Sequence, residues 1–290
     1  MIFLTYREGH TLKLGLKTTA GVVDVHAAAS ACRLDLPATP DAFYGAGSDT
    51  LPKFQALMEC ELIEYTQPEA DLTLAPVVPN PGKIICVGLN YRKHAAESNM
   101  AAPTIPILFS KFNNTLAANG EDVPITKYLT QVDYEAELGV VIGKTAKDVS
   151  EAEALDYVLG YCNANDLSDR AAQFMTSQWL PGKTPDKFLP LGPYLVTADE
   201  AGDPQAMPVN GWFNGELRQN SSTSDMVFSV AQIISFASRY MTLEPGDIIS
   251  TGTPEGVIFG MKEKVWMKPG DEYVIEIGNL GRLTNRMVVG

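Results

Sequence analysis

Residues 132–144 read VDYEAELGVVIGK, and this stretch carries the clearest structural signal in the chain. Side chains at positions i and i+2 of a strand leave from the same face, so we expect Glu135 and Glu137 to point together. Residues 138–142 are apolar throughout, which is typical of a strand covered on both faces. Two carboxylates on such a buried strand must become protonated or bind a cation, whereas on an exposed strand they would simply be solvated.

A third carboxylate follows a strand that we expect at residues 158–162. Asp166 lies where this strand ends and a polar run begins. Three carboxylates without an imidazole or thiolate partner form a hard oxygen site, which favours Mg²⁺, Mn²⁺ or Ca²⁺ over zinc. The alternative is that Asp166 caps a helix or closes a turn.

A histidine and a glutamate lie three residues apart in the Ala-rich segment 90–97. On a short helix His94 and Glu97 would share a face. A carboxylate beside an imidazole raises its basicity and fixes its tautomer, which suits a general base that activates water. The alternative is an ordinary pair on the surface.

Four further polar residues are candidates for binding an anion or a substrate. Arg170 and Gln173 follow Asp166 at +4 and +7, on one face of any helix that begins there. Lys183 lies in a Gly-Lys loop, and Thr253 lies in a turn whose backbone N–H groups and hydroxyl could hold an anion. Each of these signals is weak by itself.

Short strands and turns dominate the rest of the chain. The Pro-rich stretch 74–82 is the best candidate for a linker, so we expect a small N-terminal α+β domain at 1–76 and a main domain at 83–290. Two Pro-Gly-Asp turns and many short strands favour a mostly-β roll or sandwich over a doubly wound sheet. Ser224 and Asp225 are expected to cap a helix that runs from Met226 to Phe236.

Composition excludes several classes of function. There are 22 Lys and Arg residues against 35 Asp and Glu residues, a net charge of −13, which disfavours nucleic acids and membrane surfaces as partners and attracts metal cations. No apolar run reaches the ~18–20 residues of a membrane span. The four cysteines form no C-x-x-C pair, so we expect free buried thiols and a cytoplasmic protein.

Taken together, these segments resemble the fumarylacetoacetate hydrolase family over most of residues 83–290. The resemblance is carried by an ordered series: GLNYRKHAAE (88–97), VDYEAELGVVIGK (132–144), GYCNANDLSDRAAQ (160–173), GKTPDKFLPLGP (182–193), VNGWFNGELRQ (209–219) and TLEPGDIISTGTPEGV (242–257). Such a series is far more specific than any single motif. It implies an α+β protein with a mixed β-sandwich roll as its catalytic domain, a divalent metal, usually Mg²⁺ or Mn²⁺, and a homodimer.

The resemblance also implies roles for single residues. The family's E-x-E…D metal ligands match Glu135, Glu137 and Asp166, and its H-x-x-E pair on a mobile lid matches His94 and Glu97. The positions that contact substrate or the developing oxyanion match Lys183, Arg170, Gln173 and Thr253. An insertion-like segment, residues 259–267, is expected to reshape the edge of the site.

The implied substrate is a small 2-oxo acid that chelates the metal. In a hydrolase, His94 assisted by Glu97 would activate the water that attacks the distal carbonyl, and the metal would stabilise the enolate released by C3–C4 cleavage. The leading interpretation is a C–C hydrolase of acylpyruvate-type or sugar-derived 2,4-dioxo acids. Alternatives are an oxaloacetate-type decarboxylase, a 2-oxo acid isomerase, or a catalytically silent binding protein.

Overall fold

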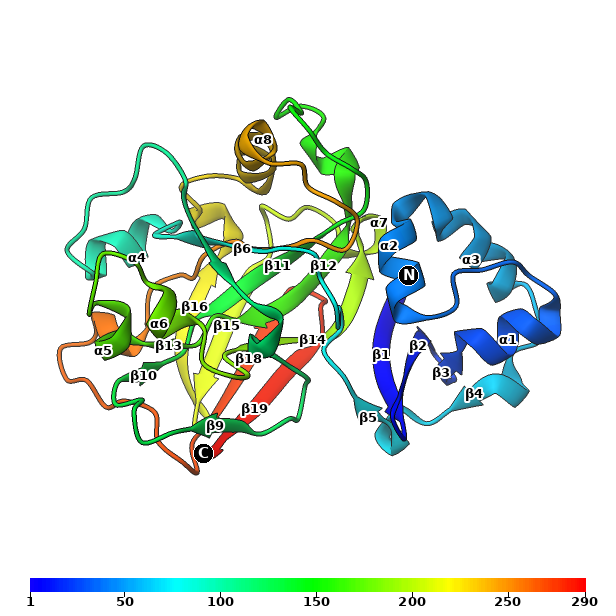
Figure 1. Ribbon diagram of the computed structural model, residues 1–290, viewed down its shortest axis with the longest axis horizontal. Helices are drawn as coiled ribbons and strands as arrows, with labels where there is room; N and C mark the ends of the chain where they lie inside the picture. The colour runs from blue at the N-terminus through cyan, green and yellow to red at the C-terminus, as the bar shows by residue number, and fades with distance from the viewer.

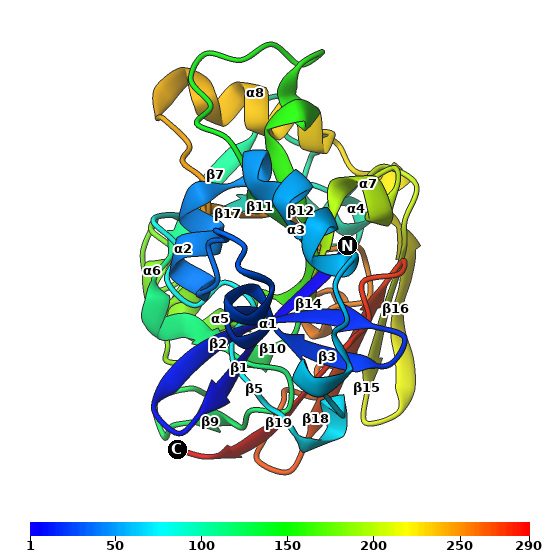
Figure 2. The same cartoon turned by 90° about the vertical axis from the view of Figure 1, so that its right-hand side faces the viewer.

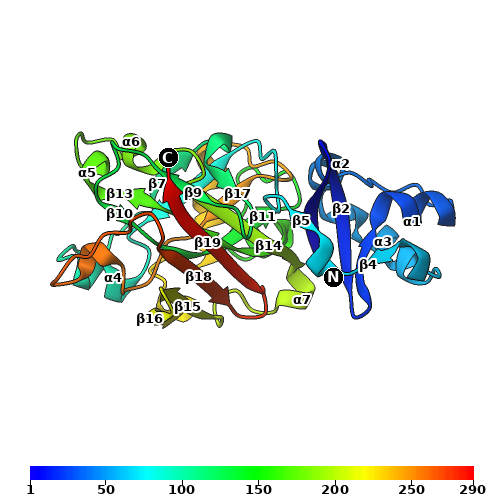
Figure 3. The same ribbon diagram turned by 90° about the horizontal axis from the view of Figure 1, so that it is seen from below.

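Two large sheets and a short strand pair form the protein in the computed structural model, which describes residues 1–290. The larger sheet has twelve strands and runs in the order β4-β3-β2-β1-β14-β12-β11-β17-β6-β7, with β5 paired to β1 and β8 to β14. The second sheet has five strands in the order β16-β15-β18-β19-β9. Figure 1 shows the N-terminal segment in blue at one end of the molecule, and Figure 3 shows from below that the whole is elongated along this direction.

The strands of the larger sheet are β1 (Ile2–Glu8), β2 (Thr11–Thr18), β3 (Gly21–Asp24), β4 (Thr66–Gln67), β5 (Thr73–Leu74), β6 (Ile84–Gly88), β7 (Ile107–Lys111), β8 (Leu116–Ala117), β11 (Ala136–Ile142), β12 (Val158–Asn165), β14 (Leu189–Thr197) and β17 (Ile248–Ser250). The five-stranded sheet holds β9 (Val123–Ile125), β15 (Pro208–Phe213), β16 (Glu216–Ser222), β18 (Glu272–Ile277) and β19 (Arg282–Val289). The separate pair is β10 (Val132–Asp133) and β13 (Ser168–Asp169).

The helices are short. They are α1 (Val25–Cys32), α2 (Pro40–Ala46), α3 (Leu51–Met58), α4 (Arg92–Glu97), α5 (Arg170–Gln173), α6 (Leu180–Lys183), α7 (Ala198–Ala201) and α8 (Val230–Tyr240). The 3-10 turns are η1 (Ser48–Thr50), η2 (Ile63–Tyr65), η3 (Glu69–Asp71), η4 (Asn113–Thr115), η5 (Ala154–Tyr157), η6 (Thr223–Asp225) and η7 (Ile258–Gly260). None of the helices combines the length and the hydropathy that a membrane crossing requires.

Strand β11 is covered on both faces, as its uninterrupted apolar run predicted. All of its residues are buried, and it pairs antiparallel with β12 on one side and β17 on the other. One face contributes Leu138 and Val140 to the core shared with the five-stranded sheet and α8. The other face contributes Val141 to a second core that includes Phe43 of α2. Figure 2 shows the N-terminal helices in front of β11 and β12. The mixed α+β class is therefore confirmed.

Both Pro-Gly-Asp turns form the same local structure. The Asp247 carboxylate accepts a hydrogen bond from the Glu244 N–H at 2.7 Å, and the Asp271 carboxylate accepts one from the Lys268 N–H at 2.8 Å. The glycine of each turn has a positive φ, which is 86° at Gly246. Because glycine has no Cβ, this backbone conformation costs it little free energy. Each turn leads directly into a strand, β17 and β18.

The helix expected to begin at Met226 begins four residues later, so its predicted start was wrong. Residues Thr223–Asp225 form a 3-10 turn, and Met226 forms an isolated bridge with Tyr91. The helix cap is Ser229, whose side chain accepts from the Gln232 N–H while the Gln232 side chain accepts from the Ser229 N–H. This reciprocal capping box satisfies two backbone donors, which Ser224 and Asp225 do not do for α8.

The Pro-rich segment between the two expected domains is packed against the larger sheet. Val77 and Val78 are buried, the Val77 N–H donates to the Leu191 carbonyl, and the Thr5 hydroxyl donates to the Val77 carbonyl. Strand β1 pairs with β14, so the sheet runs from the N-terminal segment into the rest of the chain. The division into domains 1–76 and 83–290 stays a prediction.

The four cysteines are free thiols. Cys86 and Cys162 are buried, whereas Cys32 and Cys60 are partly exposed. Free thiols were expected from the sequence, and burial holds for two of the four.

Candidate functional site

Antiparallel pairing brings the three predicted metal ligands together. Ala136 at the start of β11 lies opposite Asn165 at the end of β12, so the residues just outside the two strands are neighbours. The Glu135 N–H donates to the Asn165 side-chain oxygen at 3.1 Å, and the Asp166 N–H donates to the Glu135 carbonyl at 3.0 Å. Asp166 therefore does not cap a helix. The cap of α5 is Asp169, whose carboxylate accepts from the Ala172 N–H.

Glu135, Glu137 and Asp166 form one buried cluster. Each offers a carboxylate oxygen within 4.8 Å of the others, and all three side chains are buried. Glu137 accepts hydrogen bonds from the Ser250 hydroxyl at 2.6 Å and from the Gly252 N–H at 2.9 Å, but it makes no ion pair. Burial, and then the charges of Asp166 and Glu135, raise the pKa of Glu137 to about 8.

This donor set fits a hard divalent cation. All three groups supply oxygen, no thiolate or imidazole shares the cluster, and Glu137 is buried without an ion-pair partner. Mg²⁺ and Mn²⁺ prefer such carboxylate ligands.

Three buried cations surround the carboxylates. Lys183 at the end of α6 lies 2.6 Å from Glu135 and 2.7 Å from Asp166. Burial alone would lower the pKa of Lys183, but the charges of Asp166 and Glu135 raise it above its usual value, so the ammonium stays protonated. Arg170 lies 2.6 Å from Glu135, and Lys111 lies 2.5 Å from Asp166.

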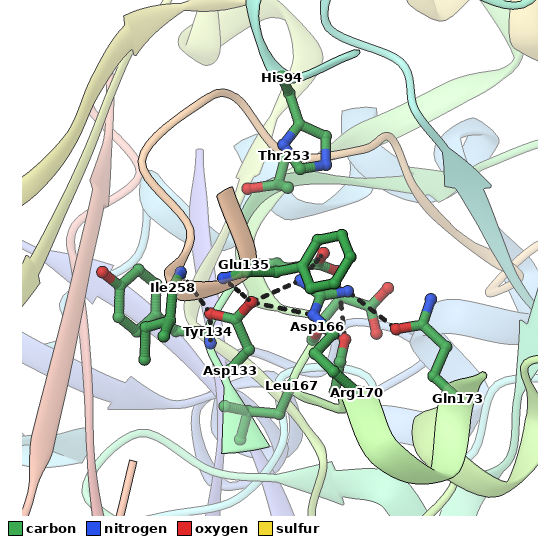
Figure 4. Close-up of polar contacts among 12 residues, drawn as sticks. His94, Asp133, Tyr134, Glu135, Asp166, Leu167, Arg170, Gln173, Thr253 and Ile258 are labelled. Atoms are coloured by element: carbon green, nitrogen blue, oxygen red, sulfur yellow. Dashed lines mark hydrogen bonds and ion pairs between the residues drawn. The ribbon is translucent and has the colours of Figure 1, made fainter. Parts of the chain in front are cut away.

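Two of these network residues were missed by the sequence analysis. Lys111 has no exposed side-chain surface and also donates to the Leu167 carbonyl at 2.9 Å. The only signal for Lys111 in the sequence is its position within the mostly apolar stretch 107–112. Asp133 accepts from Arg170 at 2.9 Å and from the N–H groups of Ile258 and Phe259 at 2.8 and 3.0 Å (Figure 4).

His94 and Glu97 lie together on α4, at the other side of the site. The His94 Nδ1 lies 2.8 Å from the Glu97 carboxylate, which leaves Nε2 as the ring nitrogen without a bond to Glu97. The Glu97 carboxylate also accepts from the Gly256 N–H at 3.0 Å, so α4 is tied to the segment 254–260. His94 is only 6% exposed, which excludes the ordinary surface pair. Figure 4 shows His94 beside Thr253, with Glu135 and Asp166 below them.

The remaining predicted residues are part of the same arrangement. The Gln173 side-chain oxygen accepts from the Arg170 guanidinium at 2.9 Å across one turn of α5. The Thr253 hydroxyl donates to the Ala136 carbonyl at 3.0 Å and accepts from the Gln219 amide at 2.8 Å. These contacts hold Thr253 at the start of β11.

One cavity joins the predicted residues. It is lined by His94, Glu135, Glu137, Asp166, Arg170, Gln173, Lys183 and Thr253. Glu97 does not line the cavity, but it contacts His94, which does. The cavity is also lined by apolar side chains, those of Val87, Leu89, Met100, Phe109, Phe174, Trp179 and Phe259. These apolar residues were not predicted, since they come from five separate segments.

Comparison with known proteins agrees with the fold. Residues 83–288 match the family model described as fumarylacetoacetate (FAA) hydrolase C-terminal. The chain belongs to the fumarylacetoacetate hydrolase family. Over 279 residues it is 39% identical to the mitochondrial oxaloacetate tautomerase FAHD2B of Bos taurus, covering 95% of this chain and 87% of the relative.

Two solved structures show the same fold along the full chain. The fumarylacetoacetate hydrolase of psychrophilic Exiguobacterium antarcticum is 31% identical with a TM-score of 0.82, and each chain is covered completely. The maleylpyruvate hydrolase of Sphingobium sp. SYK-6, solved with manganese (II) and pyruvate, is 29% identical with a TM-score of 0.80 and the same coverage. The family members are enzymes with hydrolase or tautomerase names. The cytoplasmic location stays a prediction, because the bovine relative is named as mitochondrial.

Proposed function

We propose that the chain is a divalent-metal-dependent hydrolase that cleaves the C–C bond of acylpyruvate-type or sugar-derived 2,4-dioxo acids. One observation carries the proposal. His94, which is hydrogen-bonded to Glu97, lines the same cavity as the cluster of Glu135, Glu137 and Asp166. A cation-binding cluster and a candidate general base across one cavity are the two parts that such a hydrolysis needs.

Glu135, Glu137 and Asp166 would hold the cation, and Mg²⁺ or Mn²⁺ suits their oxygen donors. When bound, the cation supplies Lewis-acid polarisation of the carboxylate and keto oxygens of a 2-oxo acid. The manganese and pyruvate named for the Sphingobium maleylpyruvate hydrolase support this assignment by similarity.

The protein's own residues account for the proton transfers and the positioning. His94 removes a proton from a water molecule as its oxygen attacks the distal carbonyl, and Glu97 fixes the tautomer and stabilises the imidazolium that forms. The C3–C4 bond then breaks to release a carboxylic acid and the enolate of pyruvate, and the proton that His94 removed from water returns to C3 of the enolate to give pyruvate. The protonated Lys183 lies beside the charge that develops on the pyruvate fragment.

Arg170 and Gln173 orient the substrate from α5, and Thr253 does so from beside the start of β11. Arg170 is itself held by Asp133 and Glu135, so its guanidinium cannot swing away from the site. Such preorganised donors reduce the reorganisation that accompanies the reaction.

A tautomerase or decarboxylase acting on oxaloacetate is the second candidate. It is favoured by the name of the bovine relative, which is 39% identical over 95% of this chain. Both reactions need stabilisation of the same kind of enolate, but neither needs an attacking water. A catalytically silent binding protein is a weaker candidate, because the contact between His94 and Glu97 is intact.

A substrate screen separates the two leading candidates. Purified protein with Mg²⁺ or Mn²⁺ is offered acylpyruvates, 2,4-dioxo sugar acids and oxaloacetate. Release of pyruvate is followed with lactate dehydrogenase and NADH, and the keto–enol change of oxaloacetate is followed by ultraviolet absorbance. We expect pyruvate from an acylpyruvate. Turnover of oxaloacetate alone would replace the hydrolase with the second candidate.

We also propose that the protein is a homodimer, on the basis of its family membership. Sedimentation equilibrium at micromolar concentration should give twice the 31.4 kDa mass of one chain. A single species of 31.4 kDa would contradict the proposal.

A further inference from the structure

The helix that carries His94 and Glu97 has little stability of its own. Helix α4 is six residues long, and isolated helices of this length are marginal in water. Its N-cap position is Tyr91, whose side chain makes no capping hydrogen bond. Leu89, which precedes the helix, has a φ of 54°, a backbone conformation that costs a residue with a Cβ free energy. The position of α4 is therefore set by its contacts with other segments.

The start of α4 is held by the segment 225–228, which leads from η6 to α8. The Asp225 carboxylate accepts a hydrogen bond from the Lys93 N–H at 3.1 Å, so it caps α4 from 132 residues away in the chain. The Arg92 guanidinium donates to the Met226 carbonyl at 2.6 Å. Asp225 thus supplies to α4 the side-chain cap that the helix lacks in its own sequence.

Asp225 is carried by a firmly held stretch of backbone. Thr223, in the same 3-10 turn, is fully buried; its N–H donates to the Met207 carbonyl and its hydroxyl accepts from the Met207 N–H, both at 2.9 Å. After the turn, the Asn90 side chain accepts from the Phe228 N–H at 2.8 Å and donates to the Phe228 carbonyl at 3.1 Å. The backbone on both sides of Asp225 is therefore fixed, as a residue that positions another requires.

The position of His94 depends on the helical form of α4. The end of the helix is attached separately, through the bond from the Gly256 N–H to the Glu97 carboxylate at 3.0 Å. His94 lies between this attachment and the cap at Lys93, and it lines the cavity. One helical turn places its Nδ1 beside Glu97, so unwinding at the start of α4 would separate the pair.

We infer that Asp225 is a positioning residue for the water-activating pair: it caps α4 from outside the helix and so holds His94 at the cavity. This inference rests on the proposed function and adds to it a residue that neither lines the cavity nor belongs to the cluster of Glu135, Glu137 and Asp166. Asp225 acts through the backbone of α4. Replacement of a capping side chain by alanine shifts a helix equilibrium by about 2–30-fold, whereas asparagine caps as well as aspartate does.

Hydrogen–deuterium exchange, followed by mass spectrometry in the presence of Mg²⁺, tests the cap without a substrate. Asp225→Ala should speed exchange in residues 92–98 by about 2–30-fold, because α4 opens more often without its cap. Asp225→Asn should exchange at nearly the wild-type rate, since its amide oxygen can accept the same bond from the Lys93 N–H. Exchange in the rest of the chain should stay unchanged, whereas a residue that only stabilises the fold would speed exchange throughout.

Hydrolysis of an acylpyruvate by the same variants connects the cap with catalysis. Asp225→Ala should lower kcat by about 2–30-fold, in step with the faster exchange, and Asp225→Asn should restore it. Affinity for Mn²⁺ should be unchanged in both. The matched control is Asp122→Ala, because Asp122 is exposed and has no contact with α4, so the variant loses the same charge without losing the cap. Its exchange and its kcat should equal those of the wild type.

The possible failures of this inference and of the proposed function are distinct. Unchanged exchange in Asp225→Ala would overturn the inference and leave the proposed function standing. Equally fast exchange in Asp225→Ala and Asp225→Asn would overturn it too, and so would faster exchange with unchanged kcat, because the cap would then not position His94. A wild type that releases no pyruvate from any acylpyruvate would instead overturn the proposed function, even where α4 exchanges as expected.

Discussion

Removal of divalent cations with EDTA should abolish turnover, and Mg²⁺ or Mn²⁺ should restore it. The reason lies in the buried cluster, where Glu137 has no ion-pair partner and Glu135 and Asp166 offer further oxygen atoms within 4.8 Å. Glu137→Gln removes one of three anionic ligands. Isothermal titration should show that its affinity for Mn²⁺ falls by more than the roughly 10–100-fold that is typical of outer-shell substitutions.

Glu263→Gln is the matched control for this experiment. Glu263 is exposed and lies away from the cluster, so the variant loses the same formal charge without losing a ligand. Its affinity for Mn²⁺ should equal that of the wild type. Full activity of protein freed of metal, or equal weakening in both variants, would contradict a metal centre at Glu135, Glu137 and Asp166.

The cluster of Glu135, Glu137 and Asp166 could be predicted from the sequence because its geometry follows from one strand pairing. A strand with a buried apolar run places Glu135 and Glu137 on one face, and an antiparallel partner that ends at Asn165 places Asp166 beside them. His94 and Glu97 could be predicted for a similar reason, since a single helical turn fixes their separation.

The groups that hold this cluster could not be predicted, because they depend on pairings between distant segments. Lys111 contacts Asp166 although β11, β17 and β6 lie between β12 and β7 in the order of the sheet. No local pattern specifies that order. Asp133 depends likewise on segment 254–260 folding back over it, and its partners there are backbone N–H groups, which leave no mark in the sequence.

Local competition explains the misplaced start of α8. Ser224, Asp225 and Ser229 are all good N-cap residues, and sequence alone does not rank them. Only Ser229 is followed at the right distance by a glutamine that completes the capping box, while the Phe228 N–H is bound by the Asn90 side chain. The contact with Asn90, 138 residues away in the chain, favours the later start.

Replacing His94 by alanine should reduce hydrolysis by about 10²–10⁴-fold, the usual contribution of a general base. Affinity for Mn²⁺ should be nearly unchanged, because His94 is not among the clustered ligands. Decarboxylation of oxaloacetate needs no attacking water, so it should fall much less. The control is His26→Ala, since His26 is exposed and its loss should leave both reactions unchanged.

The bond between Glu97 and Gly256 adds a second effect that must be separated from the chemistry. Loss of the His94 ring could also loosen α4 from segment 254–260, which would admit water to the cavity and weaken ligand binding. Glu97→Gln addresses this, since it keeps an oxygen that can accept from the Gly256 N–H but removes the charge that makes His94 basic. If water activation is the role of the pair, the variant should have a lower kcat, while its affinity for the unreactive 2-oxo acid 2-oxopentanoate stays near that of the wild type.

Weaker binding with unchanged kcat would instead assign Glu97 to closure of the cavity. Equal activity of the wild type, His94→Ala and Glu97→Gln on a good acylpyruvate would exclude water activation by this pair and favour the decarboxylase or tautomerase.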